Sequence, residues 1–155
     1  MTKTNAVRML EAAEILFSTF EYEVDENDLS GETVAKKINA ETDAVFKTLV
    51  ARNEANEIFV FCIPVTMELN LKKAAKAAGS KSIALIHVKE LLILTGYIRG
   101  GCSPIGMKKK FPTFLDETAQ LFETIFVSAG VRGMQIRLSP LDLQKMTEAE
   151  FADLT

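Results

Sequence analysis

The sequence predicts an α+β fold in a single domain that spans residues 1–155. A chain of 155 residues suits one domain with a sizeable core. Helical and strand patterns follow one another without strict alternation, and several strand patterns lie close enough together to form hairpins. These observations favour a mixed, mostly antiparallel sheet flanked by helices over a doubly wound parallel fold.

The first quarter of the chain predicts two helices with a strand between them. Residues 4–20 carry apolar side chains at helical spacing, and Thr4 is a candidate N-cap. Residues 20–24 alternate between apolar and polar types and predict a short strand. Ser30 can cap a second helix over residues 31–38.

Two apolar segments, 44–51 and 57–63, predict a pair of strands joined by a hairpin turn at 52–56. Lys47 is the exception in the first segment, where its neighbours are otherwise apolar or small. A lysine there either points to solvent from a sheet edge or reaches into a cleft. Taken alone, the pattern favours solvent, because lysine is rarely buried.

The middle of the chain predicts a helix, a strand and a second helix. Asn70 can cap a helix over residues 71–78, and Gly79 is placed to end it. Residues 82–86 predict a short strand, and residues 88–94 predict the second helix.

The last third of the chain predicts a hairpin and then helical structure. Residues 113–121 fit a helix and a strand equally well. Residues 123–129 and 134–138 predict a hairpin across a glycine-containing turn. Ser139-Pro140 is a favourable helix start, and residues 147–150 have the pattern of a capping box for a last short turn or helix.

The most distinctive stretch is the segment 94–106, LTGYIRGGCSPIG, which holds four of the eight glycines of the chain. Residues 100–104 predict a shaped backbone loop whose free N–H groups could face an oxygen-rich ligand. Lys108, Lys109 and Lys110 follow the loop and could hold a polyanion. The alternative is a tight turn followed by a solvated run of charge.

The net charge of −3 hides an uneven distribution of charge along the chain. Residues 71–110 contain nine basic side chains against one acidic side chain, whereas residues 21–43 contain eight acidic against two basic ones. A mildly acidic protein with one basic segment suits a local contact with a polyanion better than a general coat for nucleic acid. We therefore expect no DNA partner.

Several other function classes are disfavoured by the composition. Cys62 and Cys102 are too few for a disulfide framework, and with His87 as the one histidine we expect no metal site. Phosphate- and dinucleotide-binding glycine motifs are missing, so we expect no cofactor. The first residues do not resemble a signal peptide and no apolar run could cross a membrane, so we expect a cytoplasmic protein with reduced thiols and no membrane partner.

Four stretches together carry a resemblance to a known family. They are VFKTLV at 45–50, LKKAAK at 71–76, TGYIRGGCSPIG at 95–106, and VSAG followed by RG at 127–133. In this order they resemble the YbaK/EbsC family of stand-alone aminoacyl-tRNA deacylases, which are related to the editing domain of bacterial prolyl-tRNA synthetase. The resemblance extends from about residue 4 to residue 151 and implies a mixed, partly barrel-like sheet flanked by helices.

The activity that the resemblance implies is trans-editing, the hydrolysis of Cys-tRNA(Pro) that prolyl-tRNA synthetase makes by mistake. Cysteine and proline are similar in size, so one binding pocket cannot separate them well enough for translation, and a second hydrolytic site is needed. The implied partners are the acceptor end of tRNA(Pro) and prolyl-tRNA synthetase. The implied chemistry is substrate-assisted: the thiol of the attached cysteine attacks its own ester carbonyl.

The resemblance also implies roles for individual residues. Lys47 matches the strand lysine on which activity depends in the family, which shifts the expectation for Lys47 from solvent to the cleft. Residues 100–104 match the Gly-x-x-x-Pro loop, whose N–H groups would stabilise an oxyanion, and Tyr22 lies nearest to the tyrosine of the family. The predicted site residues are Lys47, Gly100, Gly101, Cys102 and Ser103 for catalysis, Tyr22, Thr48, Pro104 and Ser128 for substrate binding, and Arg99, Lys72, Lys73, Lys76, Lys108, Lys109 and Lys110 for tRNA phosphates.

Three alternatives remain open at the level of sequence. The first is that Cys102 acts as an enzymic nucleophile, although the sequence gives it no partner. We expect His87 to cap or pack a helix and Cys62 to lie in the core. A sibling deacylase could instead clear Ala-tRNA(Pro) with a bound water. A non-enzymatic binding or regulatory module could also keep the same fold.

Overall fold

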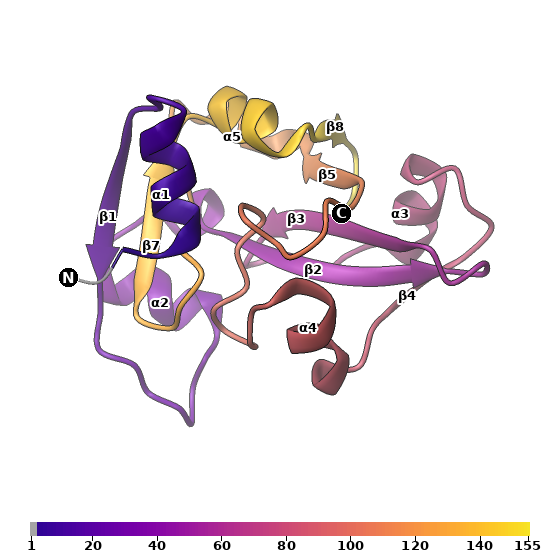
Figure 1. Cartoon of the computed structure of the whole chain (residues 1–155), viewed down its shortest axis with the longest axis horizontal. Coiled ribbons are helices and arrows are strands. Elements are labelled where there is room, and N and C mark those ends of the chain that lie inside the picture. The colour runs from indigo at the N-terminus through magenta and orange to yellow at the C-terminus, as the bar shows by residue number, and fades with distance from the viewer. Residues whose placement is uncertain (1–2) are drawn as a thin grey trace.

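The computed structural model describes residues 3–155 and places eight strands in two sheets (Figure 1). The helices are α1 (Asn5–Ala12), α2 (Gly31–Lys37), α3 (Leu71–Ala77), α4 (Val88–Thr95) and α5 (Pro140–Thr147), with the 3-10 turns η1 (Thr42–Ala44) and η2 (Glu117–Leu121). The strands are β1 (Phe17–Glu21), β2 (Phe46–Asn53), β3 (Ile58–Pro64), β4 (Ile83–Leu85), β5 (Thr113–Asp116), β6 (Ile125–Ser128), β7 (Met134–Leu138) and β8 (Glu150–Ala152).

The two sheets differ in their strand pairing. The smaller sheet has the order β1-β7-β6 and is antiparallel throughout. The larger sheet has the order β4-β2-β3-β5-β8, in which β2 runs antiparallel to β3 and β4 while β5 is parallel to both β3 and β8. A single parallel bridge between Val45 and Phe126 links the sheets at one corner. The predicted α+β fold with a mixed, mostly antiparallel sheet is confirmed, and the described strands do not close into a barrel.

Three apolar clusters hold the helices against the sheets. The largest packs α1 against both sheets, with Leu10 and Ile136 fully buried in it. A second cluster packs α3 on the larger sheet around Phe61. A third and smaller cluster packs Ala35 of α2 against Phe126 of β6. Helix α2 therefore covers the smaller sheet close to the corner where the two sheets meet.

Four helix starts predicted from capping residues are confirmed. Thr4 Oγ1 accepts a hydrogen bond from Val7 N at 3.2 Å, and Asn70 Oδ1 accepts from the second and third residues of α3. Ser30 and Ser139 cap α2 and α5 in the same way. Each cap satisfies N–H groups that have no partner inside the helix, which fixes where the helix begins.

Two predicted segments are wrong in type or length. The first helix ends at Ala12 rather than near residue 20, because Glu14 adopts a left-handed φ of +57° and Phe17–Glu21 pairs with β7. Residues 147–150 do not start a helix; instead Glu148, with φ +55°, ends α5 and the chain enters β8. In both places the pairing of strands distant in sequence overrides a local helical pattern.

The ambiguous segment 113–121 contains one element of each kind. Its first residues form β5, parallel to β3, and its second half is the turn η2. In the described part of the chain, no helix is long and apolar enough to span a membrane.

Candidate active site

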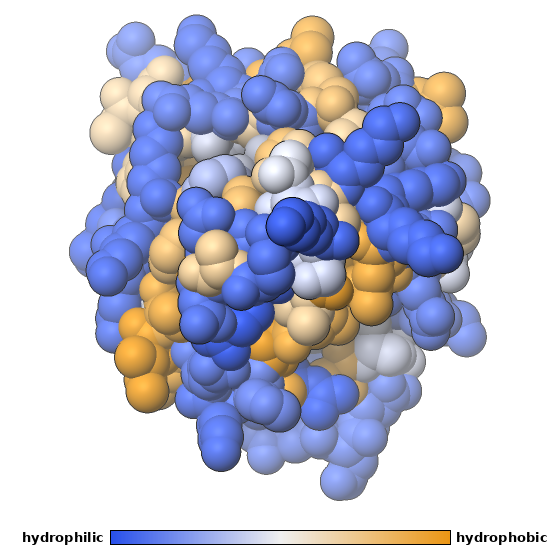
Figure 2. All heavy atoms as spheres, turned by 90° about the vertical axis from the view of Figure 1, so that its right-hand side faces the viewer, coloured by the Kyte–Doolittle hydropathy of each residue, from blue (hydrophilic) through white to orange (hydrophobic). Residues whose placement is uncertain are grey.

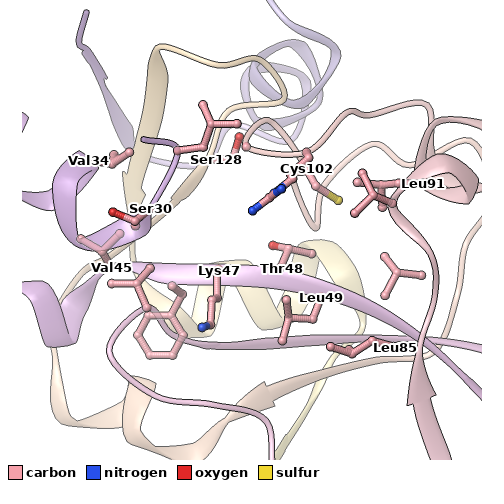
Figure 3. Close-up of a pocket in the computed structure, with 18 of the residues that line it drawn as sticks. Ser30, Val34, Val45, Lys47, Thr48, Leu49, Leu85, Leu91, Cys102 and Ser128 are labelled. Carbon is pink, nitrogen blue, oxygen red and sulfur yellow. The ribbon is translucent and has the colours of Figure 1, made fainter. Parts of the chain in front are cut away.

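A pocket of about 440 Å³ lies in the angle between the two sheets (Figure 3). Strands β2 and β6 touch at the bridge between Val45 and Phe126 and then diverge, so that Thr48 and Ser128 line opposite sides of the space. The start of α2, the segment from β4 to α4 and the glycine loop complete its walls. This volume is in the range of small-molecule sites.

The wall formed by β2 includes an unpaired strand edge. Along a strand, the backbone N–H and C=O of alternate residues point to opposite edges. Val45 O accepts from Val65 N on the β3 side, whereas Val50 O accepts from Ile86 N on the other side. By this alternation the N–H and C=O of Phe46 and Thr48 face away from β3, and β4 pairs with β2 only from Ala51 onward. Phe46 lies beside the bridge to β6, whereas Thr48 lies between this bridge and β4, on a stretch of the edge with no strand partner in residues 3–155.

Lys47 is half-buried on β2 and lines this pocket. In Figure 3 its side chain leaves β2 on the side opposite to Thr48, with the ammonium pointing away from Cys102. Within the described residues no ion pair or hydrogen bond holds its Nζ. Lys47 is therefore a cation at the pocket with no partner among the described residues, and its role in catalysis, which the resemblance implies, stays a prediction.

The glycine loop presents only part of its backbone to the pocket. Gly100 and Cys102 line the pocket, whereas Gly101 lies behind them and its N–H donates to Ile98 O at 2.9 Å inside a turn. The expectation that Gly101 supplies an N–H to an oxyanion is thus corrected, because that donor is already used. The backbone N–H groups of Gly100 and Cys102 remain as candidates.

The turn between β6 and β7 supports the glycine loop from behind. Arg132 Nε donates to Arg99 O at 2.8 Å. A Cβ built on Gly101 would lie 3.0 Å from Arg132 N and from Val131 C, so the two backbones approach as closely as glycine allows. Gly100 has a φ of +82°, which also favours glycine. The conformation of the glycine loop therefore depends on its contacts with this turn.

Cys102 has the properties of a buried core thiol. Burial raises the pKa of Cys102 to about 12, so its thiol is protonated at neutral pH. Burial likewise raises the pKa of Cys62 to about 12. His87 lines the same pocket, but it is the N-cap residue of α4, where its backbone N–H donates to Glu90 Oε2 at 2.9 Å. No hydrogen bond joins His87 to Cys102 in residues 3–155, so neither is set up for nucleophilic catalysis.

The remaining predicted substrate residues separate into two groups. Thr48 and Ser128 line the pocket as expected. Ser103 and Pro104 are buried behind the loop, where Ser103 Oγ accepts from Ile105 N at 3.2 Å. Tyr22 follows β1, bonds through its N–H to Gly133 O at 2.9 Å, and does not line the pocket. These three residues do not line the pocket, and their predicted roles stay predictions.

The predicted phosphate-binding residues are spread over three regions. Arg99 lines the pocket and is exposed. The α3 lysines lie at the end of the molecule that faces the viewer in Figure 2, a mainly hydrophilic surface with apolar areas between, and Lys73 pairs with Asp153 at 3.0 Å. The lysines after the loop are exposed, and Lys110 pairs with Glu148 at 2.6 Å. Lys72, Lys73, Lys76, Lys108, Lys109 and Lys110 do not line the pocket, and their contact with tRNA stays a prediction.

Sequence reasoning missed two polar residues at this site. Arg132 holds the glycine loop, and Gln135 of β7 lines the pocket with a buried amide whose Oε1 has no hydrogen-bond partner. Gln135 occupies an alternating strand pattern, MQIRL, in which a polar residue is expected to face solvent. That Gln135 is enclosed becomes evident only in the folded protein, where α2 packs on the same face of the smaller sheet.

Residues 26–146 match the model of the family described as aminoacyl-tRNA editing domain. The chain belongs to this family. It is 48% identical over 153 residues to the Enterococcus faecalis protein named "Putative Cys-tRNA(Pro)/Cys-tRNA(Cys) deacylase EbsC", covering 99% of this chain and 93% of that one. It is also 31% identical over 83 residues to the proline–tRNA ligase of Brachyspira hyodysenteriae, which is 54% of this chain and 14% of that enzyme.

The fold of this editing domain also occurs among solved structures. A crystal structure described as "a putative trans-editing enzyme for prolyl tRNA synthetase" aligns with a TM-score of 0.83 at 24% identity, covering 99% of each chain. The family resemblance predicted from the four sequence stretches is thereby confirmed. The predicted class of enzyme is confirmed as well: an aminoacyl-tRNA deacylase related to the editing part of prolyl-tRNA synthetase.

Proposed function

We propose that this editing domain hydrolyses Cys-tRNA(Pro), and that the thiol of the attached cysteine is the nucleophile. The relative from Enterococcus faecalis is named for Cys-tRNA(Pro) and Cys-tRNA(Cys), and it shares nearly the full length of this chain. The observation that carries the mechanism is the lack of an activated nucleophile among the described pocket residues. The Cys102 thiol is buried and protonated, and within residues 3–155 no serine or cysteine that lines the pocket is hydrogen-bonded to a histidine. The Ser30 hydroxyl caps α2 and donates to Thr33 Oγ1.

The substrate itself supplies the nucleophile in this mechanism. The sulfur of the esterified cysteine forms a bond to its own carbonyl carbon, and the bond from that carbon to the ribose oxygen breaks. The thiol proton goes to the ribose oxygen, so the products are tRNA with a free hydroxyl and a cyclic thioester. The enzyme has only to hold the ester in a reactive conformation and stabilise the charge that develops on the carbonyl oxygen.

The pocket provides groups for both tasks. The N–H groups of Gly100 and Cys102 lie at its wall and can donate to the carbonyl oxygen as it becomes negative. Lys47 points away from Cys102 in Figure 3, which favours a contact with a phosphate or ribose oxygen of the terminal adenosine over a contact with the ester. The ribose and the ester would then be held from two sides.

Selection of the tRNA would depend on contacts outside the pocket. Arg99 and the exposed lysines that follow the glycine loop carry positive charge beside it, which gives affinity for the acceptor stem without base specificity. A partner such as prolyl-tRNA synthetase would then supply the choice of tRNA(Pro). The cytoplasmic location expected from the sequence is consistent with this role and stays a prediction.

The test is single-turnover hydrolysis of Cys-tRNA(Pro), Ser-tRNA(Pro) and Ala-tRNA(Pro) by the purified protein. We expect rapid loss of cysteine alone, because serine and alanine lack a thiol. Clearance of alanine or serine at a similar rate would move the nucleophile to a bound water and contradict the thiol mechanism. No hydrolysis of any of the three would contradict the deacylase assignment and favour a binding module of the same fold.

A further inference from the structure

The side chain of Gln135 is an unpaired polar group at the pocket. It is only 6% exposed, and its Oε1 accepts no hydrogen bond from residues 3–155. Buried polar side chains nearly always have a partner, because an unpaired buried amide loses its hydration without compensation. Gln135 lines the pocket, so a ligand bound there could supply the missing hydrogen bond.

The strand register places Gln135 beside a second polar residue. Gln135 of β7 and Ser128 of β6 are direct cross-strand partners, so their side chains share one face of the smaller sheet. Ser128 also lines the pocket, and its Oγ accepts from Gly130 N at 3.2 Å. Phe20 and Phe126 lie on the same face, in edge contact at 5.5 Å between ring centroids, and Arg137 stacks its guanidinium over the Phe20 ring. Gln135 and Ser128 are the polar residues of this face that line the pocket, and together they form one polar spot there.

The chemistry of this spot suits a hydrogen-bond donor of low charge density. It combines the free Oε1 of Gln135 with the backbone carbonyl of Thr48, on the edge of β2 across the pocket. Of the described residues that line the pocket, only Glu32 is acidic, and it is exposed. An amino group fits such a set of neutral acceptors, and an α-amino group has a pKa of about 8, so it can enter with little cost of desolvation.

We propose that Gln135 is a substrate-binding residue whose Oε1 accepts a hydrogen bond from the α-amino group of the aminoacyl ester. This inference rests on the proposed function, since it concerns the amino acid that the pocket holds. With the amino group held at Gln135 and the ester carbonyl at the glycine loop, two substituents of the substrate Cα are fixed. The side chain of an L-amino acid then has one direction left, which places its thiol for attack.

The first test compares two esters that differ only in the amino group. They are Cys-tRNA(Pro) and 3-mercaptopropionyl-tRNA(Pro), which keeps the thiol and the ester. For Gln135→Met we expect kcat/KM to fall about threefold to tenfold on the cysteine ester, the size of one hydrogen bond between neutral groups, and to stay unchanged on the deamino ester. An equal loss on both esters would overturn the assignment.

Two further variants separate binding from a structural role. Gln120→Met is the matched control, because Gln120 is exposed on η2 and does not line the pocket, and it should behave as wild type on both esters. Gln135→Glu keeps an acceptor oxygen and should retain the preference for the amino-bearing ester; loss of that preference would count against the proposal. Gln135→Met should melt at the wild-type temperature or above, since no hydrogen bond is lost, whereas a clearly lower Tm would assign Gln135 a structural role.

Failure of the proposed function would be distinguishable from failure of this inference. If the wild-type protein cleaves neither ester, binding is measured by calorimetry with amide-linked analogues, 3′-cysteinylamino-3′-deoxyadenosine and its 3-mercaptopropionyl counterpart. Tighter binding of the amino-bearing analogue by wild type but not by Gln135→Met would support the subsite without any turnover. Equal binding of the two analogues by wild type would overturn it.

Discussion

Lys47 is the pocket residue whose charge is hardest to explain by folding alone. It occupies an interior position of β2 between Phe46 and Thr48, and its Nζ has no partner within residues 3–155. A half-buried ammonium with no counter-ion contributes nothing evident to folding, and its stem could be replaced by an apolar one. We propose that Lys47 instead makes a contact that forms only when the substrate is bound.

Replacing Lys47 by methionine tests this interpretation. Methionine keeps an unbranched apolar stem and removes the charge, so we expect turnover of Cys-tRNA(Pro) to fall by about a hundredfold or more while Tm changes by less than about two degrees. Single-turnover kinetics and thermal melts give the two readouts. The control is Lys145→Met on the exposed face of α5, which should leave both unchanged. Normal turnover by Lys47→Met would remove Lys47 from the mechanism.

Lys47 and Gln135 show which site residues can be predicted from the sequence and which cannot. Lys47 could be selected because a lysine among apolar residues breaks the pattern of its own strand. Gln135 keeps to the pattern of its strand, and α2, a helix about a hundred residues earlier in the chain, packs on Phe20 and Phe126 of the same sheet face. No local sequence pattern indicates that a helix so distant in sequence covers this face, so Gln135 could be found only in the folded protein.

At the scale of elements, the glycine loop and the turn between β6 and β7 behave as one unit. Gly101 N–H closes a turn on Ile98, Arg132 Nε binds Arg99 O, and Gly101 packs against the backbone of Val131 and Arg132. The direction of the Gly100 and Cys102 N–H groups therefore depends on a contact between two chain segments. Such a contact would fix the geometry of the proposed oxyanion site without any side chain of the loop.

The variant Gly101→Ala tests the dependence of the loop on this contact. Its new Cβ would meet Val131 C and Arg132 N at 3.0 Å, which are backbone atoms that cannot rotate away. We expect a loss of about 1–3 kcal/mol in stability and a marked fall in turnover, because the loop must move. The control is Gly79→Ala, where a φ of +62° costs about 1 kcal/mol but the space is open and the pocket is distant. Full activity of folded Gly101→Ala would contradict a role for the contact.

Element boundaries were predictable where a local chemical signal ends an element. Thr4, Ser30, Asn70 and Ser139 set helix starts through their own side chains, and each prediction is confirmed. The end of α1 and the start of β8 depend on partners elsewhere, namely β7 and β5. Residues 147–150 match a capping box in sequence, but Thr147 is the last residue of α5 and Glu150 is the first residue of the strand that pairs with β5.

At the scale of the whole molecule, the pocket exists because two sheets meet at one bridge and separate. The α+β class and most strands follow from local patterns, but the division into two sheets does not, since it depends on which edge of β2 stays unpaired. The same packing buries Cys62, Cys102 and Tyr97 around the junction. Burial raises the pKa of each of these three groups to about 12.

These raised pKa values predict how the stability of the fold depends on pH. In the unfolded chain the thiols lose their protons near pH 8.5 and the phenol near pH 10, whereas in the folded protein all three keep them to about pH 12. Their contribution to stability is therefore fully present below about pH 8.5 and is lost as pH rises toward 12, with a slope of about 1.4 kcal/mol per pH unit for each group that titrates. Urea unfolding between pH 7 and pH 11 measures this slope. Cys62→Ala should lower the slope above pH 9, while a stability that stays level from pH 8 to pH 11 would show that these groups are accessible to water in the folded protein.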